Sequence, residues 1–238
     1  MNSIILNGIS STTIQGLLIQ NLPPITKPRI RAEAEEIDGR DGDIITTLGY
    51  GAYDKEFQIG LYGNFDIDQI IEYFNSSGTV TFSNEPDKYY NYQILEQIDF
   101  EKLLRFRTAT VVMHVQPFKY SIADNSNTYT ISQGTTSLVI RNVGNIYSKP
   151  ILTLTGSGTI NLYLNSTQAF VLNLGANATT IAIDVNNMNA YNPSTSTFMN
   201  RQVTGNYDNF RLAIGKNTIS WTGGTVTQIK IQNYSRWI

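Results

Sequence analysis

The feature that most constrains the fold is a long run of strand-favouring residues between positions 105 and 120. Apolar side chains occupy every second position of this run, which is the period of a β-strand with one buried face. Pro117 has no amide hydrogen to donate to a sheet, so we expect the strand to end there or to reach a sheet edge. The predicted buried face carries Ala109, Val111, Met113 and Val115.

A change of composition after Tyr120 predicts a boundary between two domains. Residues 1–120 carry 10 Lys and Arg against 16 Asp and Glu, whereas residues 121–238 carry 7 against 3, so the net charges are −6 and +4. The 238 residues suffice for two domains of ordinary size. We therefore expect domains at 1–120 and 121–238, with the new composition opening at Asp124–Asn127.

Several classes of protein are excluded by what the sequence lacks. It contains no cysteine, which rules out a disulfide framework and a thiolate metal site. The N-terminus has no basic region of the kind that opens a signal peptide, and no apolar run is long enough to cross a membrane. We expect a soluble protein that is not exported by a signal of its own.

One helix is predicted in the first domain, starting after Asp66. Asp66 followed by Gln69 has the capping-box pattern, and Gly78 follows the predicted end. Apolar residues at helical spacing share one face, which should cover a sheet. These residues are Ile67, Ile70, Ile71 and Phe74. The predicted strands of this domain are Ile4–Leu6, Thr13–Gln20, Phe57–Tyr62, Thr79–Ser83, Tyr89–Ile98 and Arg105–Gln116.

Two segments of the first domain read as loops. Residues 22–28 contain three prolines and predict an extended, exposed connector. Asp38–Asp43 combines two glycines with three aspartates, typical of a tight solvated turn whose carboxylates cap backbone amides. The aspartates stand at relative positions one, four and six, which does not fit the one, three and five of an EF-hand loop. We therefore interpret this turn as structural or as a subunit contact.

The turn offers a specific set of interface residues. Arg40 presents a planar guanidinium group that suits a carboxylate on a neighbouring subunit, and the flanking aspartates can accept hydrogen bonds. We predict subunit contacts from Asp38, Arg40, Asp41 and Asp43.

No catalytic pattern supports an enzyme. His114 is the only histidine, so it has neither a histidine nor a cysteine partner for nucleophilic or metal chemistry. Glu33 and Glu35 could supply the carboxylate pair of a glycosidase, but two such residues on one strand face are more typical of a solvated acidic surface. The nucleophile elbow, the phosphate loop and the dinucleotide fingerprint are all missing. We predict no enzymatic activity, no cofactor and no metal.

The second domain shows short alternating segments every eight to twelve residues, separated by Gly and Asn turns. This spacing, without a helical period, predicts an antiparallel β-sandwich of the jelly-roll type. The predicted strands are Ser137–Ile140, Ile151–Leu154, Ile160–Leu164, Phe170–Leu174, Ile181–Ile183, Phe210–Ile214, Thr218–Trp221 and Val226–Gln232.

Aromatic residues of this domain could stack on sugars, and Tyr191 and Trp221 are the candidates. The favoured alternative places Trp221 in the core or an interface, because it ends a strand whose apolar residues alternate.

The order of several motifs resembles the distal tail proteins of siphophages, the long-tailed phages with non-contractile tails. In the first half the motifs are Glu36–Asp43, the predicted helix and Gln116–Tyr120. The motifs of the second half resemble the galectin-like domain of that family. They are Asn142–Asn145, Asn200–Gly205, Gly215–Trp221 and Arg236–Trp237.

This resemblance implies a structural protein of which six copies form a ring at the tail tip. Residues 1–120 would be a ring-forming domain of β-sandwich or split-barrel type with one α-helix, and residues 121–238 a galectin-like domain. The implied partners are the major tail tube protein, the tail-associated fibre or lysin protein and receptor-binding proteins, in a virion assembled in the bacterial cytoplasm. DNA would pass through the ring without specific binding, which the acidic first domain favours, because duplex affinity depends on Lys and Arg.

The alternative function is a carbohydrate-binding module for host recognition, built on the second domain. Some members of the family carry an inserted sugar-binding module, and this chain has no room for one.

Overall fold

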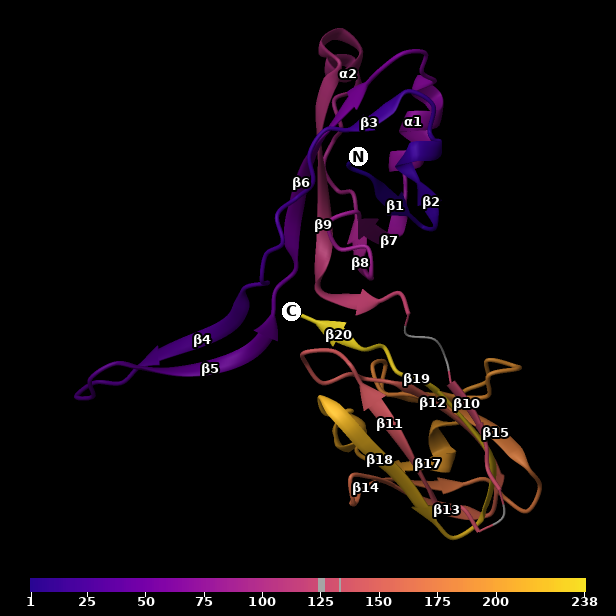
Figure 1. Cartoon of the computed structure of the whole chain (residues 1–238). Coiled ribbons are helices and arrows are strands. Elements are labelled where there is room, and N and C mark those ends of the chain that lie inside the picture. Colours follow the sequence, from indigo (N-terminus) through magenta and orange to yellow (C-terminus); the bar gives the residue numbers. More distant parts are fainter. Residues whose placement is uncertain (124–126, 133) are drawn as a thin grey trace. The chain divides into compact units, whose positions relative to one another are not determined.

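The computed structural model describes residues 1–123, 127–132 and 134–238. It divides into two compact units, one with residues 1–120 and Ile238 and one with residues 121–237 (Figure 1). Residues 124–126, in the stretch where the new composition opens, lie outside the described residues. Antiparallel strands dominate both units, so the predicted mainly β fold is confirmed. No helix in the described parts of the chain is long and apolar enough to span a membrane.

The first unit is built on a sheet with the strand order β2-β1-β7-β8-β9-β6-β3. These strands are β1 (Ile4–Leu6), β2 (Ile9–Ser10), β3 (Leu17–Ile19), β6 (Tyr53–Leu61), β7 (Ser77–Phe82), β8 (Lys88–Gln93) and β9 (Thr108–Ser121). The predicted strand at 13–20 is shorter than expected. The Ser10 hydroxyl accepts a hydrogen bond from the Thr12 amide and starts a 3₁₀ turn at Ser11–Thr13, so the chain becomes extended only at Leu17.

Strand β9 confirms the predicted alternation. Its inward side chains are at most 2% exposed, and they are Ala109, Val111, Met113 and Val115. Of the two alternatives predicted for Pro117, that the strand ends there is wrong, because β9 continues to Ser121, and that it reaches an edge agrees with the loss of its β6 partner. Pairing with β6 stops at Val115, before the proline, so the missing amide hydrogen removes no bond from that ladder.

A second helix, α2 (Phe100–Phe106), precedes β9, so the predicted start of that strand at Arg105 is wrong. Asp99 accepts a hydrogen bond from the Lys102 amide, and Glu101 pairs with Arg105 one turn later. Arg107 then adopts a left-handed conformation (φ 57°) that ends the helix. The first unit therefore contains two α-helices and not one.

Helix α1 (Ile67–Phe74) begins as predicted, with the Asp66 carboxylate accepting hydrogen bonds from the Asp68 and Gln69 amides. Its buried face is different. Ile70 and Phe74 are buried together with Tyr73, whereas Ile71 is 38% exposed, so the prediction that Ile71 shares the buried face is wrong. Gly78 lies inside β7, and the helix ends at Asn75.

The second unit consists of two five-stranded sheets, ordered β10-β19-β12-β15-β16 and β11-β18-β13-β14-β17. The first sheet contains β10 (Asn127–Thr130), β12 (Ile151–Ser157), β15 (Thr179–Asp184), β16 (Asn189–Tyr191) and β19 (Thr225–Gln232). The second contains β11 (Ser137–Asn142), β13 (Thr159–Leu164), β14 (Thr167–Asn173), β17 (Val203–Gly205) and β18 (Gly215–Thr222). The unit also contains the short strand β20 (Arg236–Trp237) and the 3₁₀ turns Asn200–Gln202 and Tyr207–Phe210.

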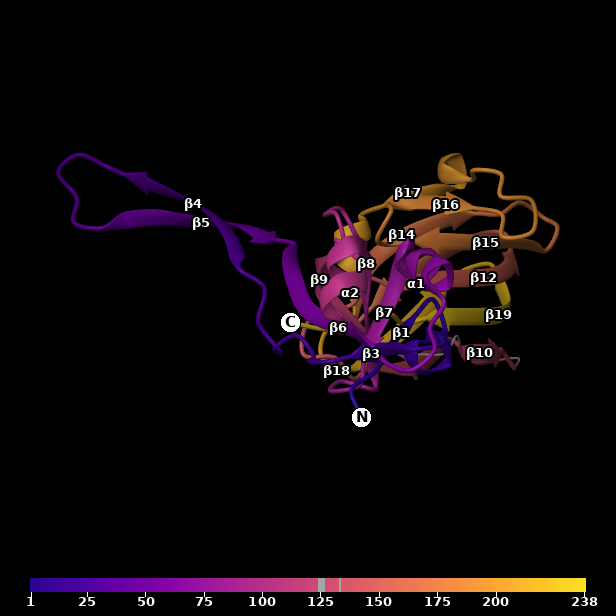
Figure 2. The same cartoon turned by 90° about the horizontal axis from the view of Figure 1, so that it is seen from above.

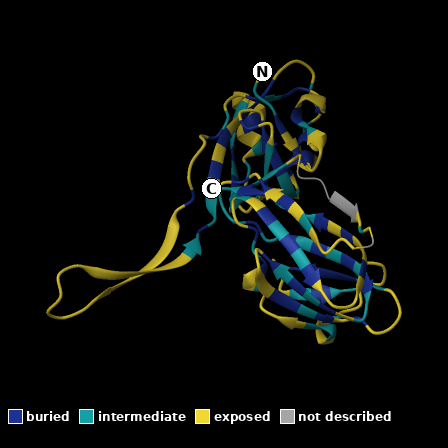
Figure 3. Cartoon of the chain, turned by 60° about the horizontal axis from the view of Figure 1, so that its bottom comes forward, coloured by how far each residue is buried: buried dark blue, intermediate teal, exposed yellow. Residues whose placement is uncertain are grey.

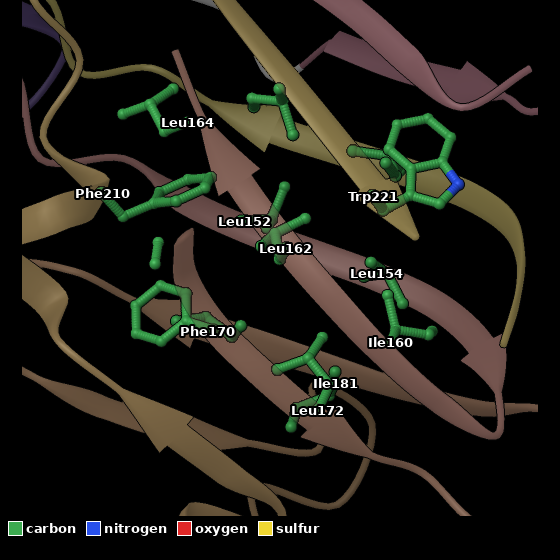
Figure 4. Close-up of a cluster of buried hydrophobic side chains, with 14 of the residues drawn as sticks. Leu152, Leu154, Ile160, Leu162, Leu164, Phe170, Leu172, Ile181, Phe210 and Trp221 are labelled. Atoms are coloured by element: carbon green, nitrogen blue, oxygen red, sulfur yellow. The ribbon is translucent and has the colours of Figure 1, made fainter. Parts of the chain in front are cut away.

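Side chains from both sheets form one core, as the alternating pattern predicts (Figure 4). Leu152 on β12, Leu162 on β13 and Phe170 on β14 are fully buried within it. The predicted strand at 210–214 is not formed. Tyr207–Phe210 is a 3₁₀ turn instead, and Leu212 makes only an isolated bridge to Ser148.

Candidate assembly surface

The most exposed element is a hairpin of the first unit, formed by β4 (Ile30–Glu36) and β5 (Asp43–Tyr50). We call residues 30–50 the arm. It forms a two-stranded sheet of its own and extends away from β6 and β9 (Figure 2). Every residue from 29 to 48 is exposed (Figure 3). A lone two-stranded ribbon is marginally stable in water, so the arm is a candidate for burial against another chain.

The strand register gives the arm two chemically different faces. Ala32 and Ala34 lie on one face, with Ile45 directly opposite Ala34. Glu33 and Glu35 lie on the other face, which confirms the prediction that these two carboxylates share a side. One face of the arm therefore has an apolar middle formed by Ala32, Ala34 and Ile45 and ends at the tip in the Glu36–Asp43 pair, whereas the other face combines Glu33 and Glu35 with Ile44.

Large apolar side chains are exposed along the arm, which is unusual for a surface that remains in water. They are Ile30, Ile37, Ile44, Ile45 and Leu48. A bulge in β5 leaves Leu48 without a directly opposite residue in β4. Six acidic and two basic side chains between positions 30 and 50 give the arm a net charge of −4. A complementary surface would be apolar with cationic groups around it.

The tip of the arm holds the predicted interface residues. Gly39 and Gly42 have φ angles of 80° and 76°, which only glycine adopts easily, and the Arg40 amide donates to the Ile37 carbonyl at 3.1 Å. The predicted tight turn is thus formed. Asp38, Arg40 and Asp41 lie within it, and Asp43 is the first residue of β5.

Hydrogen bonds and ion pairs within one copy do not account for the charged side chains at the tip. In the described parts of the chain, no hydrogen bond runs from a backbone amide to the three aspartates, so the predicted capping is not seen. None of the ion pairs between described residues involves the Arg40 guanidinium. The structure brings these side chains together and leaves them exposed.

The base of the arm is ordered by several contacts with the rest of the unit. The Tyr50 ring packs edge-on against Phe118 of β9 with 5.5 Å between ring centroids. The Gly51 amide donates to the Arg29 carbonyl at 2.9 Å. The prediction that the proline-rich connector is exposed is wrong in part, because Pro23 and Pro28 are buried.

A buried group of charged residues lies in the same unit and was not found by sequence reasoning. Lys55 on β6, Lys119 on β9 and Glu85 in the β7–β8 loop are all buried. Lys119 pairs with Glu85, whose second oxygen accepts the Tyr90 hydroxyl at 2.6 Å. Burial lowers the pKa of the Lys55 ammonium, and the nearby Glu85 carboxylate opposes this shift. Burial and the Glu85 carboxylate raise the pKa of Tyr90.

His114 pairs with a neighbouring strand, in keeping with the structural role predicted for the only histidine of a chain without cysteine. It lies on the half-exposed face of β9, and its Nδ1 atom is 2.7 Å from the Asp54 carboxylate on the neighbouring strand β6.

The two candidate sugar contacts of the second unit are not brought together. Trp221 is 5% exposed and packs in the core, so its ring is not available for stacking (Figure 4). Tyr191 is half-buried on β16, in the other sheet. Its bridge partner Phe198 is 70% exposed, which sequence reasoning missed because Phe198 lies in a polar segment without an alternating pattern.

Comparisons with known proteins add an independent result. No family model and no curated protein sequence matches the chain. Among solved structures, that of the SPP1 Dit protein, described as a paradigm of the hub adsorption apparatus in phages infecting Gram-positive bacteria, matches with a TM-score of 0.61 and 16% identity. That match covers 97% of this chain and 98% of the other.

A second match is to a chain from the phage P2 baseplate in its activated conformation with Ca, with a TM-score of 0.50 and 12% identity. It covers 97% of both chains. The TM-score of 0.61 over nearly the whole of both chains establishes shared architecture with the SPP1 Dit protein. The chain therefore has the fold of the phage Dit hub proteins, and the predicted resemblance to distal tail proteins is confirmed at the level of the fold.

Proposed function

We propose that this protein is a structural hub component of a phage adsorption apparatus, in which copies of the chain join through their arms. The observation that carries this proposal is the arm itself, which is exposed along its length and has one face with an apolar middle. The architecture supports it, since the fold follows that of the SPP1 Dit protein over nearly the whole chain.

The assembly we propose is a closed ring of six copies at the tip of a phage tail. In such a ring each copy uses two different surfaces, one to reach its neighbour and one to receive the neighbour on the other side. The arm supplies the reaching surface, and the tip residues Asp38, Arg40, Asp41 and Asp43 extend it.

The ring would stand between the tail tube protein and the tail-associated fibre or lysin protein, and it would carry receptor-binding proteins. DNA would pass through its channel during infection. The net charge of −6 on residues 1–120 supports passage without binding, because a protein holds DNA mainly by replacing phosphate counterions with Lys and Arg. The proposal assigns the protein no enzymatic activity.

Replacement of the arm tests this proposal. We would replace residues 32–47 by a short Gly-Ser turn in the full chain and measure the assembly mass by native mass spectrometry. The parent chain should form hexamers, and the shortened chain should remain monomeric with both units folded. A parent chain that stays monomeric at high micromolar concentration, or a shortened chain that still forms hexamers, would contradict the proposal.

A second candidate function is recognition of a host carbohydrate by the second unit. The observation in its favour is the exposed Phe198 ring, which lies across a backbone bridge from Tyr191. Binding on a glycan array that is lost in both Phe198→Ala and Tyr191→Ala, with the melting temperature unchanged, would support this function.

A further inference from the structure

The connection between the arm and the sheet contains little regular structure. Residues 20–29, which lead from β3 into β4, form no strand, and on the other side only Gly51 and Ala52 separate β5 from β6. A hairpin that is exposed on all sides and joined through such segments would swing unless side chains fixed its base. Packing of Tyr50 on Phe118 holds the β5 side of the base, and two side-chain hydrogen bonds hold the connector side.

The two bonds reach neighbouring carbonyls of the connector. The Lys55 ammonium donates to the Pro24 carbonyl at 2.9 Å, and the Asn84 amide donates to the Pro23 carbonyl at 3.1 Å. A proline has no amide hydrogen, so the carbonyl is the only backbone group through which it can be held. Because the proline rings also fix φ, holding these two carbonyls determines the path of the chain that leads into the arm.

Lys55 occupies an environment that is costly for a cation. The residue is 3% exposed, and no ion pair joins its ammonium to any described carboxylate. The ammonium instead lies 5.6, 5.7 and 4.9 Å from the ring centroids of Tyr53, Phe82 and Tyr90. These aromatic faces offset part of the lost hydration. An apolar side chain of similar length would fill the same space at lower cost, so packing alone does not account for a lysine here.

Asn84 is held in place by the residue that follows it. Both belong to the loop between β7 and β8, and Glu85 anchors this loop through its ion pair with Lys119 on β9. The Tyr90 hydroxyl on β8 secures the other oxygen of Glu85. Removing one partner of such a buried pair leaves an uncompensated charge, so the loop cannot leave this position cheaply.

We propose that Lys55 and Asn84 form a clamp that fixes the direction of the arm before assembly, and that the buried Glu85–Lys119 pair holds the loop that carries Asn84. The role of this clamp in assembly rests on the proposed function, in which copies of the chain join through their arms. An arm whose direction is already set loses less conformational freedom when it docks on another copy, so it binds more tightly.

The clamp is tested by measuring how widely the arm moves. The chain has no cysteine, so Thr46→Cys on the arm and Glu72→Cys on α1 give two unique spin-label sites, both exposed. The distance distribution is recorded by double electron–electron resonance on the doubly labelled full chain, at a concentration at which native mass spectrometry shows only the monomer. We compare the parent with Lys55→Met and with Lys102→Met, a control at an exposed lysine on α2.

We expect Lys55→Met to widen the distribution at least twofold, and Lys102→Met to leave it unchanged. Asn84→Ala should also widen the distribution, by a smaller factor. If thermal unfolding shows that Lys55→Met is not folded, the Asn84→Ala variant decides the test. A width equal to that of the parent in each folded variant of the clamp overturns the proposal. Native mass spectrometry of the parent separately reports ring formation, so failure of the proposed function and failure of the clamp are distinguishable.

Discussion

A single substitution in the apolar middle of one face of the arm gives the sharpest test of how copies of the chain join. Ile45→Asp places a charge in the middle of β5 on the face shared with Ala34. In a single copy this side chain is 68% exposed, so the change should alter the free energy of unfolding by no more than about 0.5 kcal/mol. Any larger effect must arise where the arm meets another chain.

The size of that effect follows from the exposure of Ile45. Full burial of an isoleucine side chain contributes about 1.5–3 kcal/mol, and the exposed two thirds would contribute about 1–2 kcal/mol on docking. A carboxylate desolvated in the same place adds a cost of at least about 1–3 kcal/mol. Each contact should therefore weaken by about 2–5 kcal/mol. Since 1.4 kcal/mol corresponds to a factor of ten, the dissociation constant should rise by roughly 30-fold to several thousand-fold.

Sedimentation equilibrium over a range of concentrations measures this dissociation constant. Thr46→Asp is the matched control, because Thr46 is the adjacent exposed residue and lies on the other face of the arm, across from Glu33. It adds the same charge to the same strand and should change assembly far less. Equal assembly of Ile45→Asp and the parent, or equal disruption by the two variants, would refute the assignment of the Ile45 face to the subunit contact.

Three further predictions concern the tip, the core and the response to pH. Arg40→Ala, and more strongly Arg40→Glu, should weaken assembly by several kcal/mol per buried pair without changing the melting temperature of a single copy, which native mass spectrometry and calorimetry would show. Ile70→Asp should abolish the unfolding transition of the first unit, whereas Ile71→Asp, one residue along α1, should leave both calorimetric transitions in place. Burial raises the pKa of four tyrosines in the first unit, so the folded state keeps phenol protons that the unfolded chain releases near pH 10. Its stability should therefore fall as the pH rises above about 10, and more steeply than that of the second unit, where burial also raises the pKa of Tyr207, as tyrosine absorbance and denaturant unfolding would measure. The four are Tyr53, Tyr73, Tyr90 and Tyr92.

The features that could be predicted from the sequence are those controlled by neighbouring residues. The alternation along β9 follows from the two-residue period of an extended chain. The start of α1 follows from the Asp66 carboxylate, which caps the amides of the residues two and three positions later. The turn at the arm tip follows from the conformations open to Gly39 and Gly42. The candidate tip residues could be named for the same reason, because the turn that gathers them is local.

The remaining features depended on residues far apart in the sequence. Ile71 fits the helical pattern as well as Ile70, and only the packing of α1 against the rest of the unit decided that Tyr73 is buried in its place. Lys55, Glu85 and Lys119 come from three separate elements, so no local pattern indicates that they are buried together. Exposure of the arm likewise depends on what packs beside its two strands. Periodicity specifies which residues share a face, and the tertiary structure decides which faces are covered.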